Sequence, residues 1–181
     1  EYYAQATPKW ANEIERIKHW ARTMRRFKAE IHWVHEQNWG EALCAVMREK
    51  QIAHIVLPLA TTHGRNAQTS IQAQLPDTQI SSFDRSIDEW KNELFEQVDA
   101  GFTDIRAGIA QTGTLILCPD PQQPRSMSLV PPIHIALFDT TTLHDDFFSA
   151  MHALRLADDM PSNVVLISSP SKTSDIQLTL A

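Results

Sequence analysis

Two segments of the chain carry polar side chains of the kinds that bind anions. AGIAQTGTLIL (107–117) places an amide, hydroxyls and two glycines inside an otherwise apolar run, and SSPSKTSDIQ (168–177) places hydroxyls and a lysine directly after one. Hydroxyl, amide and ammonium groups, together with the free N–H groups at the start of a helix, recognise carboxylates and phosphates. We therefore predict a site for a small carboxylate or phosphorylated ligand, formed by Gly108, Gln111, Thr112, Gly113, Thr114, Ser169, Ser171, Lys172, Thr173 and Ser174.

Both segments also admit a structural explanation. Gly113 could mark a bulge or a bend in a strand whose polar residues bond to neighbouring backbone. Ser174 with Gln177 fits a helix capping box, because hydroxyl residues are common N-caps. The glycines of GIAQTG have the spacing of a nucleotide P-loop, but the Lys and Ser/Thr that should follow are not there, and the sequence holds no GxGxxG. The residues alone leave the ligand site and the structural explanation open.

Other site chemistries find little support in the sequence. The eight histidines are scattered without an HExxH-type spacing, and Cys44 and Cys118 form no CxxC pair. Structural zinc and iron–sulfur clusters need more thiolates than two. No GxSxG elbow presents a serine nucleophile. We therefore expect no metal site and no cofactor in this chain, and two inert buried thiols.

Strands and helices alternate in the first half of the chain. A long amphipathic helix is expected with Thr7 as its N-cap, Pro8 at its first position and its last apolar contact at Phe27. Capping boxes are expected at Asn38 with Glu41 and at Ser86 with Glu89. This alternation predicts βαβ units, and thus a mainly parallel sheet with helices on both faces. The expected strands are 29–34, 52–58 and 78–83, and the expected helices begin after Asn38, near Asn66 and after Ser86.

The second half begins differently. The apolar runs 107–117 and 128–139 are joined by a proline-rich loop with no helix between them, which predicts an antiparallel excursion within or beside the sheet. A helix is then expected at 144–156, a strand buried on both faces at 163–169, and a further helix from about residue 170. The apolar pattern still runs at Ala181, so we expect a tail beyond it.

Composition is that of one ordinary globular domain. The 181 residues are 43% hydrophobic and carry a formal net charge of −6, which argues against a nucleic-acid binder. RTMRRFK (22–28) is the only basic cluster, and we interpret it as the solvated face of a helix. No apolar run approaches the ~20 residues that a membrane helix needs, and the first residues lack the layout of a secretory signal. We expect a cytoplasmic protein without a membrane span.

Three segments in this order, AGFTDIRAGIAQTGTLIL, PRSMSLVPPIHIALF and MPSNVVLISSPSKTSDIQLTL, resemble the LUD-domain family of lactate utilization protein C. The resemblance is specific over residues 98–181 and rests elsewhere on the helix and strand rhythm. It implies a three-layer α/β/α domain with a mainly parallel sheet, similar to the NagB/RpiA/CoA-transferase group, plus an N-terminal helix. Residues 1–28 would form a helical extension and 29–181 the LUD-type domain, with its C-terminal end incomplete.

The resemblance also implies a function. Members take part in bacterial oxidation of L-lactate to pyruvate, with two partner proteins that hold the iron–sulfur clusters. Family members commonly carry Glu where this chain has Gln111, and an amide can be neither a carboxylate nucleophile nor a general base. The Gly/His-containing segment that usually follows the last helix is also lacking. Our leading hypothesis is an accessory or ligand-binding subunit of that system, without a redox centre of its own.

Two alternatives belong to other classes of protein. The chain could be a stand-alone transferase or isomerase that acts on a CoA-like or phosphorylated small metabolite, as the wider fold group suggests by analogy. It could also be an assembly protein that docks through the helix between Trp10 and Phe27.

Overall fold

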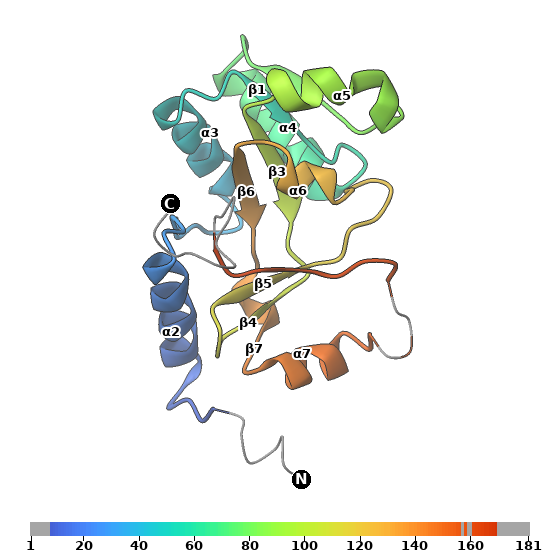
Figure 1. Cartoon of the computed structure of the whole chain (residues 1–181). Coiled ribbons are helices and arrows are strands. Elements are labelled where there is room, and N and C mark those ends of the chain that lie inside the picture. The colour runs from blue at the N-terminus through green and yellow to red at the C-terminus, as the bar shows by residue number, and fades with distance from the viewer. Residues whose placement is uncertain (1–7, 157, 159–160, 170–181) are drawn as a thin grey trace.

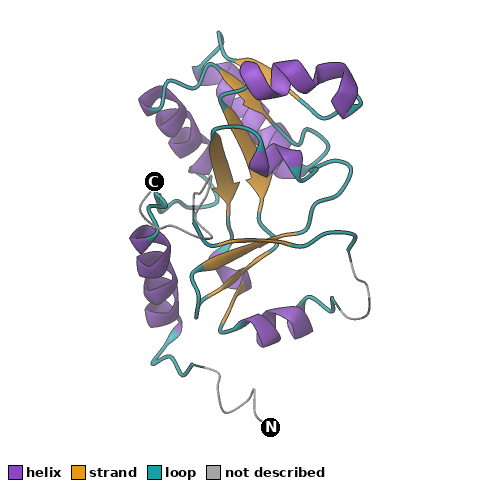
Figure 2. Cartoon of the chain, in the orientation of Figure 1, coloured by secondary structure: helices purple, strands orange, loops and turns teal. Residues whose placement is uncertain are grey.

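The protein is built on two four-stranded sheets (Figures 1 and 2). The computed structural model describes residues 8–156, 158 and 161–169. In the first sheet all strand pairs are parallel, and the strand order is β2-β1-β3-β6. The second sheet has the order β7-β4-β5-β8, with antiparallel pairs on both sides of β5 and a parallel pair between β4 and β7. The strands are β1 (His54–Val56), β2 (Gln79–Ser81), β3 (Ala100–Asp104), β4 (Ala107–Ile109), β5 (Thr114–Leu117), β6 (Ile133–Leu137), β7 (Leu143–His144) and β8 (Val165–Ile167).

Helices cover both faces of the parallel sheet. On one face, α3 (Trp39–Glu49) and α4 (Thr62–Gln74) share a buried apolar core with β1 and β3, in which Phe102 is 1% exposed. On the other face, α5 (Ile87–Glu96) and the single turn α6 (Ser126–Leu129) bury Trp90 and Met127 against Val56. Figure 1 shows this arrangement in the upper half of the molecule. The predicted α/β fold with a mainly parallel sheet is confirmed.

The second sheet also lies between two helices. Trp20 and Met24 of α2 (Glu13–Arg26) pack with Leu115 of β5 on one face. Ala150 of α7 (Phe147–Ala153) packs with Ile109 on the other. The Trp20 indole Nε1 donates to the backbone carbonyl of Thr114 at 3.3 Å. Trp20, Ala21 and Met24 of the N-terminal helix are therefore buried in the protein's own core.

Helix starts follow local side-chain hydrogen bonds, which corrects several expected boundaries. α2 begins at Glu13 and not at Pro8, because the side chain of Asn12 accepts from the Glu15 N–H at 2.9 Å. α4 begins earlier than expected, since the Thr61 hydroxyl accepts from the Gly64 N–H. Glu89 accepts from the Ser86 N–H, as the capping box at α5 predicts.

The capping box predicted for α3 is wrong. Asn38 is the N-cap residue, but its side chain accepts from the His35 N–H at 2.8 Å and makes no cap bond to the helix.

No helix in the described part of the chain combines the length and the apolar character that crossing a bilayer requires.

Two strand expectations need correction. Residues 29–34 are described, and they form no strand, because Ala29 and Ile31 pack against α2's core cluster while Trp33 is 55% exposed. β8 occurs within 163–169, but it is not buried on both faces, since Leu166 is 49% exposed. The run 107–117 does form an antiparallel excursion beside the parallel sheet, as strands β4 and β5 of the second sheet. The run 128–139 does not take part: it contains the end of α6 (Ser126–Leu129) and β6, and β6 pairs parallel with β3 in the first sheet. The helix expected from about residue 170 lies outside the described residues.

AGIAQTGTLIL is a β-hairpin rather than one interrupted strand. β4 and β5 pair antiparallel, with Ile109 opposite Thr114, and residues 110–113 form the turn between them. Gly113 has φ +63°, in the left-handed region that glycine occupies without strain. A Cβ at Gly113 would lie 2.6 Å from Cγ2 of Thr23, so α2 also closes on the turn here. The bend that Gly113 was expected to mark is confirmed.

Gly113→Ala should destabilise the protein by about 1–3 kcal/mol, because alanine resists this φ and its Cβ would press on Thr23. The free energy of unfolding from urea denaturation measures the loss. Gln111→Ala, at an exposed position of the same turn, is the control and should change stability by less than about 0.5 kcal/mol. Equal effects of the two substitutions would contradict this account of the turn.

Candidate functional site

A chain of three hydroxyls joins the two predicted ligand-binding segments. Thr112 Oγ1 lies 2.7 Å from Thr114 Oγ1, which in turn lies 2.8 Å from Ser168 Oγ. The register explains the contact: Leu115 pairs with Ile167, so the next residues along, Thr114 and Ser168, face each other across the strands. Three hydroxyl hydrogens serve two hydrogen bonds, so one O–H remains available to a further acceptor such as an oxyanion.

The other predicted site residues differ in their surroundings. Gln111 is exposed at the turn; its backbone N–H donates to the Asp145 carbonyl at 3.0 Å, and its side chain forms no hydrogen bond with any described residue. Gly108 is buried, and a Cβ there would lie 2.6 Å from the Phe138 ring, so its small size serves packing. Ser169 follows Ser168 and is partly buried. Ser171, Lys172, Thr173 and Ser174 lie outside the described residues.

Residues distant in sequence border the hairpin and were not predicted. Arg16 Nη1 of α2 contacts Asp145 Oδ1 at 3.2 Å, which links the helix to the residue that receives the Gln111 N–H. Burial, and then the nearby Arg16 guanidinium, lower the pKa of His144. Ser168 directly precedes Ser169, the first predicted site residue of the second segment. The alternation of side chains along β8 indicates that Ser168 faces Thr114, but only when the antiparallel register with β5 is known.

A second polar group lies at the carboxyl end of the parallel sheet, where ligands bind in open α/β folds. His63, in the first turn of α4, places Nδ1 2.9 Å from Asp104 Oδ1 at the end of β3. The Gln123 side chain makes two hydrogen bonds to the Asp104 backbone: its Oε1 accepts from the Asp104 N–H at 2.8 Å, and its Nε2 donates to the Asp104 carbonyl at 3.0 Å. The Trp39 ring packs on the imidazole at 5.9 Å. Nδ1 faces the carboxylate at a short distance, but the two groups are not aligned for a hydrogen bond, because the buried Asp104 Oδ1 has no hydrogen-bond partner among the described residues.

The two polar groups differ in their position relative to the parallel sheet. The second predicted segment follows β8, which is an antiparallel strand of the second sheet, so it does not lie at the carboxyl end of a parallel strand. The rule that ligands bind at this end selects His63 and Asp104 instead. The hairpin and Ser168 meet for a different reason, which is that β5 lies between β4 and β8.

The remaining titratable groups favour structural roles. His134 Nε2 lies 2.7 Å from Thr103 Oγ1 across β3 and β6, and burial lowers the pKa of His134 to about 4. Cys44 and Cys118 are both free thiols, and burial raises the pKa of each, which disfavours the reactive thiolate. Within the described ranges, no three His, Cys, Asp or Glu side chains gather closely enough to hold a metal ion.

These features define an α/β protein with a helix-covered parallel sheet and a hairpin-bearing second sheet beside it. The chain belongs to the LUD domain family, whose model matches residues 17–181. The crystal structure of a DUF162 family protein from Deinococcus radiodurans has the same fold, with a TM-score of 0.69 at 15% identity; the match covers 87% of this chain and 89% of that chain.

Curated relatives span a range of similarity. An uncharacterized protein of Neisseria meningitidis serogroup B is 47% identical over 184 residues, covering 100% of this chain and 77% of the relative. Lactate utilization protein C of Halalkalibacterium halodurans is 30% identical over 117 residues, covering 62% of this chain and 51% of the relative. The protein of the same name from Anoxybacillus flavithermus is 30% identical over 88 residues, covering 49% and 40%. The chain thus spans about half, or less, of these lactate utilization proteins.

Thr114→Val should lower the free energy of unfolding by about 1–3 kcal/mol, because valine keeps the shape but leaves the Thr112 and Ser168 hydroxyls without their shared partner. Thr112→Val is the control: Thr112 is exposed and Thr114 keeps its bond to Ser168, so the loss should stay within about 0.5 kcal/mol. Chemical denaturation measures both. A Thr114→Val protein as stable as wild type would show that the hydroxyl chain contributes nothing to the fold.

His134 should make the protein less stable in mild acid. The folded protein holds the His134 pKa near 4, whereas the unfolded chain binds that proton near the ordinary value of 6.5. Between these two pKa values the unfolded state therefore binds more protons than the folded state. As a result, the free energy of unfolding falls as the pH drops from about 6.5 to about 4, and His134 adds no pH dependence outside this window. His134→Gln should remove on the order of 2 kcal/mol of this pH dependence, measured by denaturation across the window. An unchanged pH profile would contradict it.

Proposed function

We propose that the chain is a subunit of the bacterial iron–sulfur lactate utilization system, which oxidises L-lactate to pyruvate in the cytoplasm. Family membership and the relatives named lactate utilization protein C support this proposal. The chain spans only about half, or less, of the length of those relatives. We therefore assign lactate oxidation to the complete system and not to this chain alone.

The hydroxyl chain Thr112–Thr114–Ser168 is the observation that carries the ligand-binding part of the proposal. Its spare O–H and the exposed Gln111 amide supply donors of the kind that orient a carboxylate such as lactate. Lys172 would add a positive charge, since Arg16 beside the hairpin is already paired with Asp145. Ser171, Thr173 and Ser174 would add neutral hydroxyl donors. In this role the protein binds and orients the lactate carboxylate.

Electron transfer is assigned to the partners. Oxidation of lactate to pyruvate removes two electrons and two protons, and a biological iron–sulfur cluster is held by about four thiolates. The two cysteines of this chain are free, and Cys44 is buried. The clusters would therefore belong to partner proteins, and this chain would contribute binding and positioning.

A stand-alone enzyme acting on a CoA-like or phosphorylated metabolite is the second candidate. The His63–Asp104 pair favours it, because an imidazole beside a carboxylate at the carboxyl end of the parallel sheet can serve as a general base. Gln111 counts against the version with a glutamate nucleophile at this position. Turnover by the isolated chain, lost in His63→Gln, would support this candidate over the first.

Reconstitution tests the leading proposal. The purified cluster-bearing partners should oxidise L-lactate at least about tenfold faster with this chain than without it. The double variant Gln111→Ala/Thr112→Val should raise the lactate concentration needed for half-maximal rate, because it removes two of the donors that orient the ligand. Thr69→Val, at an exposed threonine of α4, is the control and should behave as wild type. Partners that oxidise lactate equally fast alone would contradict the proposal.

A further inference from the structure

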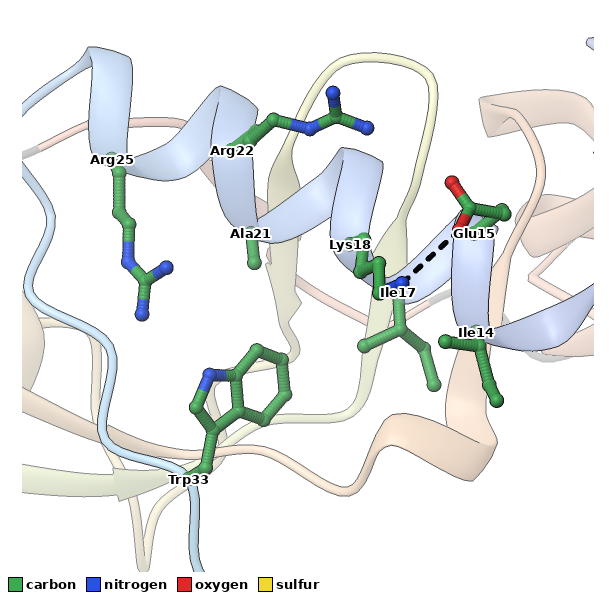
Figure 3. A pocket seen from close by; sticks show the side chains of 8 residues that line it. All are labelled: Ile14, Glu15, Ile17, Lys18, Ala21, Arg22, Arg25 and Trp33. Carbon is green, nitrogen blue, oxygen red and sulfur yellow. Dashed lines mark hydrogen bonds and ion pairs between the residues drawn. The ribbon is translucent and has the colours of Figure 1, made fainter.

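An open groove runs along α2 beside the face of the helix that packs on the second sheet. Its apolar floor is formed by Ile14, Ile17, Ala21 and the indole of Trp33, which comes from the segment between α2 and α3. Figure 3 shows Trp33 opposite the helix, with its ring directed toward it. Charged side chains complete the lining: Glu15, Lys18, Arg22 and Arg25.

The floor of the groove leaves large apolar side chains in contact with water. Ile14 of α2 is 62% exposed and Trp33 is 55% exposed, whereas Trp20 and Met24 of the same helix are each 5% exposed. Isolated exposed apolar residues are common, but neighbouring ones that line a groove mark an interaction surface. The groove borders the core: Ala21 is buried in the cluster with Trp20 and Met24, and Ile17 packs against this cluster, so the exposed part of the floor is formed by Ile14 and Trp33.

The charge of the groove is opposite to that of the protein. The chain as a whole carries −6, yet the groove holds three cations and one carboxylate. That carboxylate, Glu15, is paired with Lys18 at 3.2 Å, as the dashed line in Figure 3 marks. Arg25 reaches only a backbone carbonyl, that of Ile31 at 3.4 Å, and Arg22 forms no ion pair with any described residue. Two guanidinium groups are therefore available to carboxylates of a partner.

We propose that this groove docks an acidic amphipathic helix of a protein partner. Ile14, Lys18, Arg22 and Arg25 follow one another along twelve residues of α2, a rise of about 16 Å or about three helical turns. An apolar stripe on the partner helix fits the floor, and its flanking carboxylates meet Arg22 and Arg25. Because the floor is recessed between α2 and the Trp33 segment, a helix can enter it more readily than a flat bilayer can.

This inference rests on the proposed function for the identity of the partner, which is one of the cluster-bearing lactate utilization proteins. It narrows the docking expected for this helix to one part of its surface, because Trp20 and Met24 of the apolar stripe are buried in the core. The groove uses Ile14 and Ile17 of the same stripe, together with the charged side chains that flank them.

Charge reversal tests the groove directly. Binding of the full chain to the two purified partners is measured by biolayer interferometry at low and high salt. Arg22→Glu/Arg25→Glu should weaken binding at low salt by about tenfold or more and should remove most of its salt dependence. Trp33→Ala should weaken binding at both salt concentrations, because it removes apolar contact. Arg26→Glu, a neighbouring exposed arginine outside the groove lining, and Phe95→Ala, an exposed aromatic on α5, are the matched controls and should bind as wild type.

The outcomes separate the docking inference from the proposed function. Partner binding that Arg22→Glu/Arg25→Glu and Trp33→Ala leave unchanged would overturn the groove while the lactate role stands. Groove-dependent binding without faster lactate oxidation would overturn the function while the groove stands. A wild-type chain that binds neither partner would overturn both. Binding to vesicles of anionic phospholipid that requires Arg22 and Arg25 would replace the protein partner with a membrane surface and would also overturn the inference.

Discussion

Thr114 holds together the three parts of the molecule that form the candidate site. Its side chain connects Thr112 in the turn with Ser168 after β8, and its carbonyl accepts the Trp20 indole of α2. The residue is 3% exposed, so its polar groups depend on these partners rather than on water. Turn, neighbouring strand and N-terminal helix are therefore fixed relative to one another around a single buried threonine.

Local chemistry explains which parts of the fold could be predicted. The alternation of helices and strands around β1, β2 and β3 was visible because each element carries its own apolar period and, at α5, its own capping box. The segment 29–34 has a strand-like pattern, but Ala29 and Ile31 pack against the α2 cluster instead of pairing with another strand. Tertiary packing overrode the local pattern there.

The candidate site shows the same division. Gly113, Thr112 and Thr114 were recognisable because polar residues and glycine interrupted an apolar run. Ser168, Arg16 and Asp145 were not, because their contacts with the hairpin or its neighbours depend on strand register and on a helix about 130 residues away in the chain. His63 and Asp104 were missed for a related reason: the pair forms only when β1 and β3 lie side by side.

One helix connects the two surfaces to which we assign function. Thr23 of α2 lies against Gly113 and Trp20 donates to the Thr114 carbonyl, while Ile14 and three cationic side chains of the same helix line the basic groove. The central claim is that the hairpin binds a carboxylate ligand, and an NMR titration of the isotope-labelled chain with L-lactate tests it most directly. The account predicts saturable shifts of the Gln111 side-chain amide and of the backbone amides of residues 111–114. Shifts confined to the surroundings of His63 and Asp104, or none at all, would contradict it.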